Sequence, residues 1–140
     1  MVRFDNAFTL QPIIDAAADV GLYLIVRPGP YINSELSGGG FPGRLQRLQG
    51  ELRSTSLAFI NATNLYISAV LNIITSNEIS KGGPIILVKP ENEYSITLRD
   101  SPIEGITYLD PEYMELVKEQ FLRSNLTMPL ISNDMVPLGN

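Results

Sequence analysis

The sequence contains no histidine, no cysteine and no tryptophan among its 140 residues. Without histidine, the chain has neither the commonest general base nor the usual nitrogen ligand for a metal, and it forms no Ser-His or Cys-His catalytic pair. Without cysteine, it forms no disulfide, offers no thiolate nucleophile and builds no cysteine zinc site. If the chain supports chemistry, we therefore expect carboxylates and tyrosine to carry the protons.

Basic charge and long apolar runs are also scarce. The formal net charge is −5, so the composition gives no support for nucleic-acid binding, for which a basic patch is expected. The sequence has no uninterrupted apolar run of about 18 residues, which predicts no membrane span. The N-terminus lacks the apolar region that signal peptides need, so we expect no signal peptide in this chain. At 44% hydrophobic and 18% charged, the composition is that of one ordinary globular domain.

The most informative stretch is the short apolar run at residues 84–88, which precedes the polar motif PENEY at residues 90–94. A run of this length flanked by Gly and Pro predicts a buried strand of a parallel sheet. Because an unpaired charge is unfavourable inside a core, Glu91 and Glu93 are expected at the carboxyl end of that strand, where α/β folds open to ligands. Read alone, the motif indicates either a polar loop or an acid/base site.

Helical and strand patterns alternate on both sides of this run. An amphipathic helix is followed by a second apolar run at residues 22–26, which predicts another buried strand, and a long helix is predicted for residues 56–76. The apolar stripe of the long helix includes Leu57, with polar Thr63 off the stripe. Asp110 begins a further helix, which precedes a third strand at residues 128–131.

These elements give the order α-β-α-β-α-β, with polar residues after each strand at 31–35, 91–94 and 132–134. Because the carboxyl ends of parallel strands meet at one edge, we expect these clusters to lie on one rim. Long loops are predicted at 36–55 and 95–109. The order fits a doubly wound open sheet or part of a (β/α)8 barrel. On length alone the open sheet is preferred, since a complete barrel needs about 200 residues or more.

Three signatures resemble those of family 35 glycoside hydrolases, the β-galactosidases, in their fungal form, and they occur in the family's order and spacing. They are RPGPYINSE at residues 27–35 with GGGFPG at 38–43, GGPIILVKPENEY at 82–94, and LISND at 130–134. The resemblance runs over essentially the whole chain, from about Phe4 to Asn140. It implies a (β/α)8 TIM barrel, in which residues 1–140 would form a single partial catalytic-barrel domain.

The resemblance also assigns the predicted strands within the barrel. Residues 22–26 would be strand 3, residues 84–88 strand 4 and residues 128–131 strand 5, so the chain would cover roughly strands 3 to 5 with their helices. In the family, the nucleophilic glutamate follows strand 7, which places the nucleophile outside this chain. We therefore expect the chain to be an internal fragment of the barrel that is inactive alone.

The site residues follow from the same resemblance. The family's general acid/base is the glutamate after the asparagine of the PENEY motif, here Glu93, and its galactose-binding residues carry over to Asn33, Ser34, Glu35 and Asn92. A retaining glycosidase needs two carboxyls about 5–5.5 Å apart, one to protonate the leaving oxygen and one to attack the anomeric carbon. An asparagine beside the acid is suited to a hydrogen bond with the sugar 2-hydroxyl, which strengthens at the transition state.

Several positions depart from the family pattern or are expected to play other parts. Lys89 stands where the family usually has Gln, and Ser34 replaces the usual Ala, whose contact with the sugar is through the backbone. Arg44 replaces a common Trp. Glu91 is expected to be an exposed or ion-paired loop carboxylate rather than the acid, and Tyr94 is expected to support the site.

The implied activity is hydrolysis of terminal non-reducing β-D-galactose residues in β-galactosides by a secreted parent enzyme of carbohydrate metabolism. The resemblance implies no cofactor and no metal, a β-galactoside as partner, and neither nucleic acid nor membrane. Two other functions remain open for the chain. One is a galactoside-binding pseudoenzyme, and the other is a non-catalytic open-sheet α/β domain.

Overall fold

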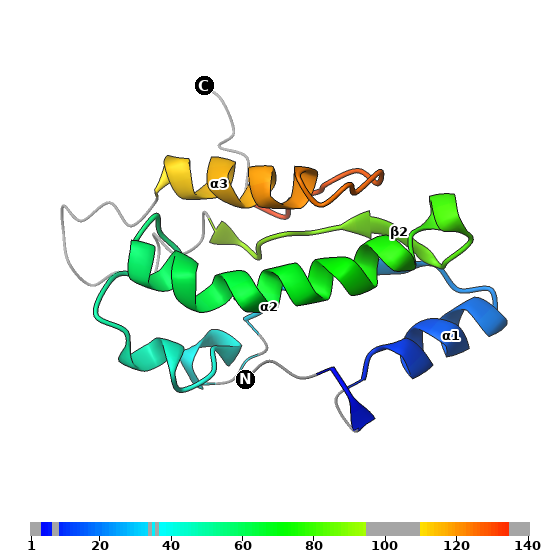
Figure 1. The fold of residues 1–140 in the computed structure, drawn as a ribbon, viewed down its shortest axis with the longest axis horizontal. Coiled ribbons are helices and arrows are strands. Elements are labelled where there is room, and N and C mark those ends of the chain that lie inside the picture. The colour runs from blue at the N-terminus through cyan, green and yellow to red at the C-terminus, as the bar shows by residue number, and fades with distance from the viewer. Residues whose placement is uncertain (1–3, 7–8, 34, 36, 95–109, 135–140) are drawn as a thin grey trace.

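The computed structural model describes residues 4–6, 9–33, 35, 37–94 and 110–134. Its elements follow the predicted alternation of helices and strands along the chain (Figure 1). They are α1 (Gln11–Asp19), β1 (Leu24–Val26), α2 (Leu57–Ser76), β2 (Ile85–Val88) and α3 (Pro111–Leu122), with short 3₁₀ helices η2 (Ser37–Gly40), η3 (Leu45–Arg47) and η4 (Ile79–Lys81) in the connections. The predicted loop at 95–109 lies outside the described residues.

β1 and β2 form a parallel two-stranded sheet. Besides this pairing, two residues of β2 make isolated parallel bridges: Val88 with Leu130, on the side away from β1, and Ile85 with Glu78. The segments therefore follow the expected order across the sheet, but the third strand expected at residues 128–131 is reduced to a bridge. Pro129 gives a physical reason, because proline has no N–H to donate to a strand ladder.

β1 is shorter and more exposed than the sequence predicts. The amide of Leu22 donates to the carbonyl of Ala17 in α1 (2.8 Å), so residue 22 is tied to the C-terminal end of the helix, and the strand begins only at Leu24. Ile25 is 57% exposed, whereas a strand inside a parallel sheet is buried on both faces. The expectation of full burial fails because β1 is the edge of the sheet within the described residues.

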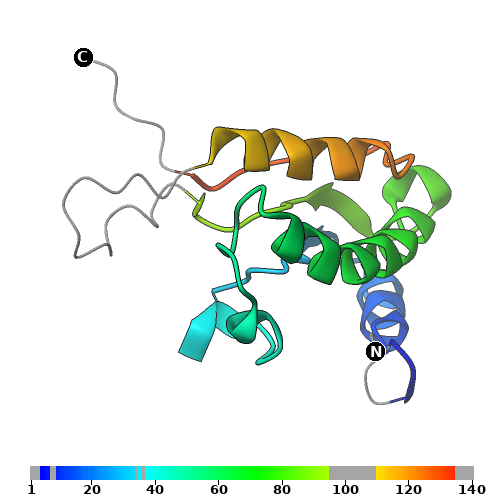
Figure 2. The same ribbon diagram turned by 60° about the vertical axis from the view of Figure 1, so that its left-hand side comes forward.

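α2 is the longest described helix and runs alongside β2 and α3 (Figure 1, Figure 2). Its predicted stripe is wrong at two positions, since Leu57 is 76% exposed and Thr63 is buried. The Thr63 hydroxyl donates to the Phe59 carbonyl one turn earlier (3.0 Å), which satisfies a buried polar group inside the helix. The buried face consists of Phe59, Thr63, Ile67, Val70, Leu71 and Ile74.

The composition of α2 also meets the length and hydropathy expected of a membrane span, with 20 residues and a mean hydropathy of 1.6. The sequence has no uninterrupted apolar run of this length, so a helix that meets these two criteria was not expected. The same composition is typical of a helix buried in a protein core, and Ile67, Val70 and Ile74 share one cluster with Ile85 and Val88 of β2. We therefore interpret α2 as a core helix.

α3 contributes Phe121, which is fully buried, to the same cluster. Replacing Phe121 with Ala should lower the free energy of unfolding by about 3–5 kcal/mol, because the substitution removes buried apolar surface and leaves a cavity. Urea denaturation followed by circular dichroism measures this loss. The next residue, Leu122, is 54% exposed, and its Ala variant is the matched control, with an expected change within about 0.5 kcal/mol. Equal losses in the two variants would contradict this description of the core.

Candidate active site

The residues that follow β1 and β2 meet at one rim of the sheet, as the sequence predicts. They surround an open hollow of about 410 Å³, lined by Arg27, Ile32, Asn33, Glu35, Asn92 and Glu93. Four of the five residues expected to form the site thus lie together, and Ser34 lies outside the described residues. Asn133, which follows the bridge at Leu130, contacts the same group of residues through hydrogen bonds.

Asn92 is held in one orientation by two donors. Its Oδ1 accepts hydrogen bonds from Nη1 of Arg27 (2.6 Å) and Nδ2 of Asn133 (3.1 Å). Because a guanidinium can only donate, the Asn92 atom that faces Arg27 has to be the oxygen. The amide nitrogen therefore points the other way, and no described residue accepts a hydrogen bond from it. Asn92, which is buried with 1% of its surface exposed, thus lines the hollow with its amide in a single orientation.

The orientation of the Asn133 amide follows from the same reasoning. Its Oδ1 accepts a hydrogen bond from the backbone amide of Glu93 (3.0 Å), which can only donate, so its Nδ2 faces Asn92. One side chain therefore fixes both the amide of Asn92 and the backbone of Glu93. Neither Asn133 nor Arg27 is among the predicted site residues, although Arg27 directly follows β1, Asn133 lies three residues after the bridge at Leu130, and both lie inside a quoted motif.

Three residues of the hollow have unusual backbone conformations. Asn33, Glu35 and Glu93 have φ values of 62°, 52° and 48°, in the left-handed region that non-glycine residues rarely occupy. Such conformations persist where the surrounding structure imposes them, and they cluster at catalytic and ligand-binding sites. The backbone thus independently indicates a functional site at the positions that the motifs select.

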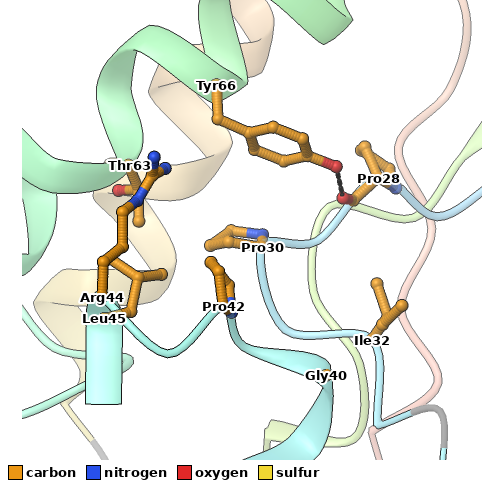
Figure 3. A pocket seen from close by; sticks show the side chains of 9 residues that line it. All are labelled: Pro28, Pro30, Ile32, Gly40, Pro42, Arg44, Leu45, Thr63 and Tyr66. Atoms are coloured by element: carbon orange, nitrogen blue, oxygen red, sulfur yellow. Dashed lines mark hydrogen bonds between the residues drawn. The ribbon is translucent and has the colours of Figure 1, made fainter. Parts of the chain in front are cut away.

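The segment that leads from β1 to Asn33 is anchored to α2. The hydroxyl of Tyr66 donates to the carbonyl of Pro28, at the edge of a second hollow of about 160 Å³ (Figure 3). Burial raises the pKa of Tyr66 still further above neutral pH, which is consistent with its role as a donor. Arg44, which stands where the family usually has Trp, lines this second hollow and not the one around Asn92.

Glu91 is buried and ion-paired, which is one of its two expected states. Its carboxylate accepts from Nε of Arg53 (2.9 Å) and from Nη2 of Arg53 (2.6 Å), and the Tyr113 hydroxyl donates to it at 3.2 Å. Burial raises the pKa of Glu91, although the hydrogen bonds and the charge of Arg53 act in the opposite direction. Glu91 does not line the hollow that Glu93 lines, so Glu93 is the better candidate for an acid that meets substrate.

Asp110 joins α3 to the loop that carries Arg53. Its side chain caps the helix by accepting from the amide of Tyr113 (3.0 Å), and it also accepts from the hydroxyl and the amide of Thr55 (2.6 and 2.7 Å). The predicted helix start is therefore confirmed. These hydrogen bonds, led by the one from the Thr55 hydroxyl, hold the pKa of Asp110 below its usual value.

Replacing Asp110 with Ala should lower the free energy of unfolding by about 1–2 kcal/mol at pH 7, the upper range for a helix cap. Because its pKa is lower in the folded chain, Asp110 stabilises the fold above its unfolded pKa of about 3.9, and this contribution is lost as pH falls through the folded pKa. Urea denaturation at pH 7 and at pH 3 should therefore show a smaller difference at the lower pH. Exposed Asp19, changed to Ala, is the control. A difference that grows towards pH 3 would contradict the assignment.

No group of three or more acidic side chains in the described ranges is placed to hold a metal ion. The polar groups around the hollow are the amides of Asn33 and Asn92, the carboxyl groups of Glu35 and Glu93, and the guanidinium of Arg27. Such groups provide both the donors and the acceptors that sugar hydroxyls require. The arrangement suits recognition of a polar, uncharged ligand next to a carboxyl that can transfer a proton.

Comparison with protein families decides which family this arrangement belongs to. The model of Glycosyl hydrolases family 35 matches residues 1–137. The chain belongs to Glycosyl hydrolases family 35. The resemblance found in the sequence motifs is thereby confirmed. Family 35 is a TIM-barrel family, and the described helices and parallel strands are of that α/β type.

Curated relatives of the chain carry names that agree with the family. The chain is 49% identical to a beta-galactosidase of Aspergillus niger over 138 residues, which are 99% of this chain and 13% of the relative. It is 46% identical to beta-galactosidase A of Aspergillus oryzae and 45% identical to a probable beta-galactosidase A of Emericella nidulans, with the same coverage. The chain therefore spans about 13% of the length of these relatives.

Proposed function

We propose that this chain forms part of the catalytic barrel of a retaining β-galactosidase, which hydrolyses terminal non-reducing β-D-galactose residues. In this proposal, residues 1–140 are a single partial domain covering strands 3 to 5 of the barrel, represented in the structure by β1, β2 and the bridge at Leu130. The observation that carries the proposal is the hollow at the strand ends, where Glu93 lies beside an Asn92 amide of fixed orientation.

Glu93 has the role of general acid/base. It protonates the glycosidic oxygen as the bond to the aglycone breaks, and it then takes a proton from the water that releases galactose. The second carboxyl of a retaining mechanism has to lie about 5–5.5 Å away and attacks the anomeric carbon. We assign that nucleophile to a glutamate outside these 140 residues, so the chain on its own is not expected to turn over substrate.

The other residues of the hollow bind galactose. The amide nitrogen of Asn92 donates to the 2-hydroxyl, and the carboxylate of Glu35 and the side chain of Asn33 bind further hydroxyls, with Ser34 contributing through its backbone. The support for these roles is the position of Asn33, Glu35 and Asn92 around the hollow. The reaction needs no cofactor or metal, because proton transfer and carboxylate attack account for both steps. We also propose that the parent enzyme is secreted.

The proposal is tested by a chimera in which this chain replaces the matching segment of the Aspergillus niger relative, with which it shares 138 aligned residues. The chimera should hydrolyse a chromogenic β-D-galactoside and leave the matching α-D-galactoside intact. A chimera that folds and binds galactose without turnover would favour the galactoside-binding pseudoenzyme. A folded chimera that neither binds galactose nor turns over would favour a non-catalytic domain.

A further inference from the structure

Arg53 lies in the loop before α2 and is buried, with 7% of its surface exposed. Its guanidinium makes three hydrogen bonds to the described part of the loop after β2, residues 89–94. Two go to the carboxylate of Glu91 (2.9 and 2.6 Å), and one goes from Nη2 to the backbone carbonyl of Asn92 (2.7 Å). Arg53 thus contacts the two residues directly before Glu93.

The same guanidinium also contacts the segment after β1. Its central carbon lies 3.8 Å from the centre of the Tyr31 ring and 5.1 Å from that of Tyr94, within the range of cation–π attraction. The Tyr31 hydroxyl in turn donates to Oδ1 of Asn33 (3.3 Å). Contacts from both strand ends that form the hollow therefore converge on Arg53.

We propose that Arg53 is a positioning residue of the site. It does not line the hollow itself, and it sets the relative placement of the two segments that carry Asn33 and Asn92–Glu93. This inference rests on the proposed function. Glu93 has a left-handed φ of 48°, which the surroundings have to impose, and the contacts of Arg53 with the two preceding residues supply such a constraint.

Lysine is a poor substitute at this position. A guanidinium is a planar fork that bonds a carboxylate and a carbonyl at the same time and stacks on aromatic rings, whereas an ammonium is a compact point charge. Arg53→Lys keeps the charge beside Glu91 but loses the stacked geometry. Because a misplacement of about 1 Å at a site can lower a rate 10²-fold, we expect kcat to fall at least tenfold, and by a larger factor than KM rises.

The experiment uses the active chimera and measures kcat, KM and the melting temperature. Exposed Arg47, in the same loop region, gives the matched control Arg47→Lys, with kinetics expected to be unchanged. The double variant Arg53→Met with Glu91→Met removes both buried charges together, so neither is left unpaired. Because it also leaves the Tyr113 hydroxyl and the Asn92 carbonyl without these partners, its melting temperature is measured first and its kinetics are recorded well below that temperature. Under those conditions it should still lose at least tenfold in kcat.

Three results would overturn the inference. If the unsubstituted chimera is active and both Arg53 variants match Arg47→Lys, Arg53 does not position the site, and the proposed function stands. If both variants lose activity only because they melt below the assay temperature, Arg53 serves stability alone. If the unsubstituted chimera folds but is inactive, the proposed function is overturned. The proposed role of Arg53 in catalysis is then overturned as well.

Discussion

Replacing Glu93 with Gln in the active chimera should lower kcat by about 10²–10⁴-fold, the usual contribution of a general acid/base. Gln keeps the shape of the side chain and its backbone amide, which donates to Asn133 (3.0 Å), but it cannot deliver a proton to the leaving oxygen. Binding of galactose should change little. The measurements are turnover of a chromogenic β-galactoside and competitive inhibition by galactose.

Two comparisons make this result specific to Glu93. Glu115→Gln, on the exposed face of α3, removes a carboxylate with no contact to the hollow and should leave kcat unchanged. An aryl galactoside with a very acidic phenol leaving group needs less protonation, so the Gln variant should lose less on it than on an alkyl galactoside. Near-normal turnover of the alkyl galactoside by the Gln variant would show that the acid is another residue.

The part of the fold around β2 was predictable because its sequence allows few alternatives. An apolar run between glycines and the charged PENEY motif has to place its carboxylates at a strand end, and Glu93 lies there. The start of α3 was equally determined, since Asp110 and the proline after it are strong local signals. Local chemistry and the global fold agree at both places.

Other features depend on contacts between distant residues and left no local signal. A buried Thr63 is satisfied by its own helix, so its polarity did not reveal its burial. Arg53 lies 38 residues from Glu91, and nothing in the spacing of the two residues indicates that they form an ion pair. The exposure of Ile25 likewise depends on which strand lies beside β1, which the apolar run itself does not specify.

Removing the side chain of Asn92 should lower kcat about as strongly as replacing Glu93. Replacing Asn92 with Ala should lower kcat by about 10²–10³-fold, the effect of removing one preorganised donor that stabilises a transition state. The donor is preorganised because Arg27 and Asn133 both bind Oδ1 and so fix the orientation of the amide. Asn72→Ala, on the exposed side of α2, is the matched control.

A substrate without the 2-hydroxyl tests the contact itself. The unsubstituted chimera should hydrolyse a 2-deoxy-galactoside much more slowly than the parent galactoside, once intrinsic reactivity is corrected with the uncatalysed rates. Asn92→Ala should discriminate far less between the two substrates, because the variant and the analogue remove opposite halves of one hydrogen bond and their effects are then not additive. Equal discrimination by the variant and the unsubstituted chimera would mean that Asn92 does not bind the 2-hydroxyl. The fixed amide would then serve the backbone of Glu93 through Asn133 rather than the sugar.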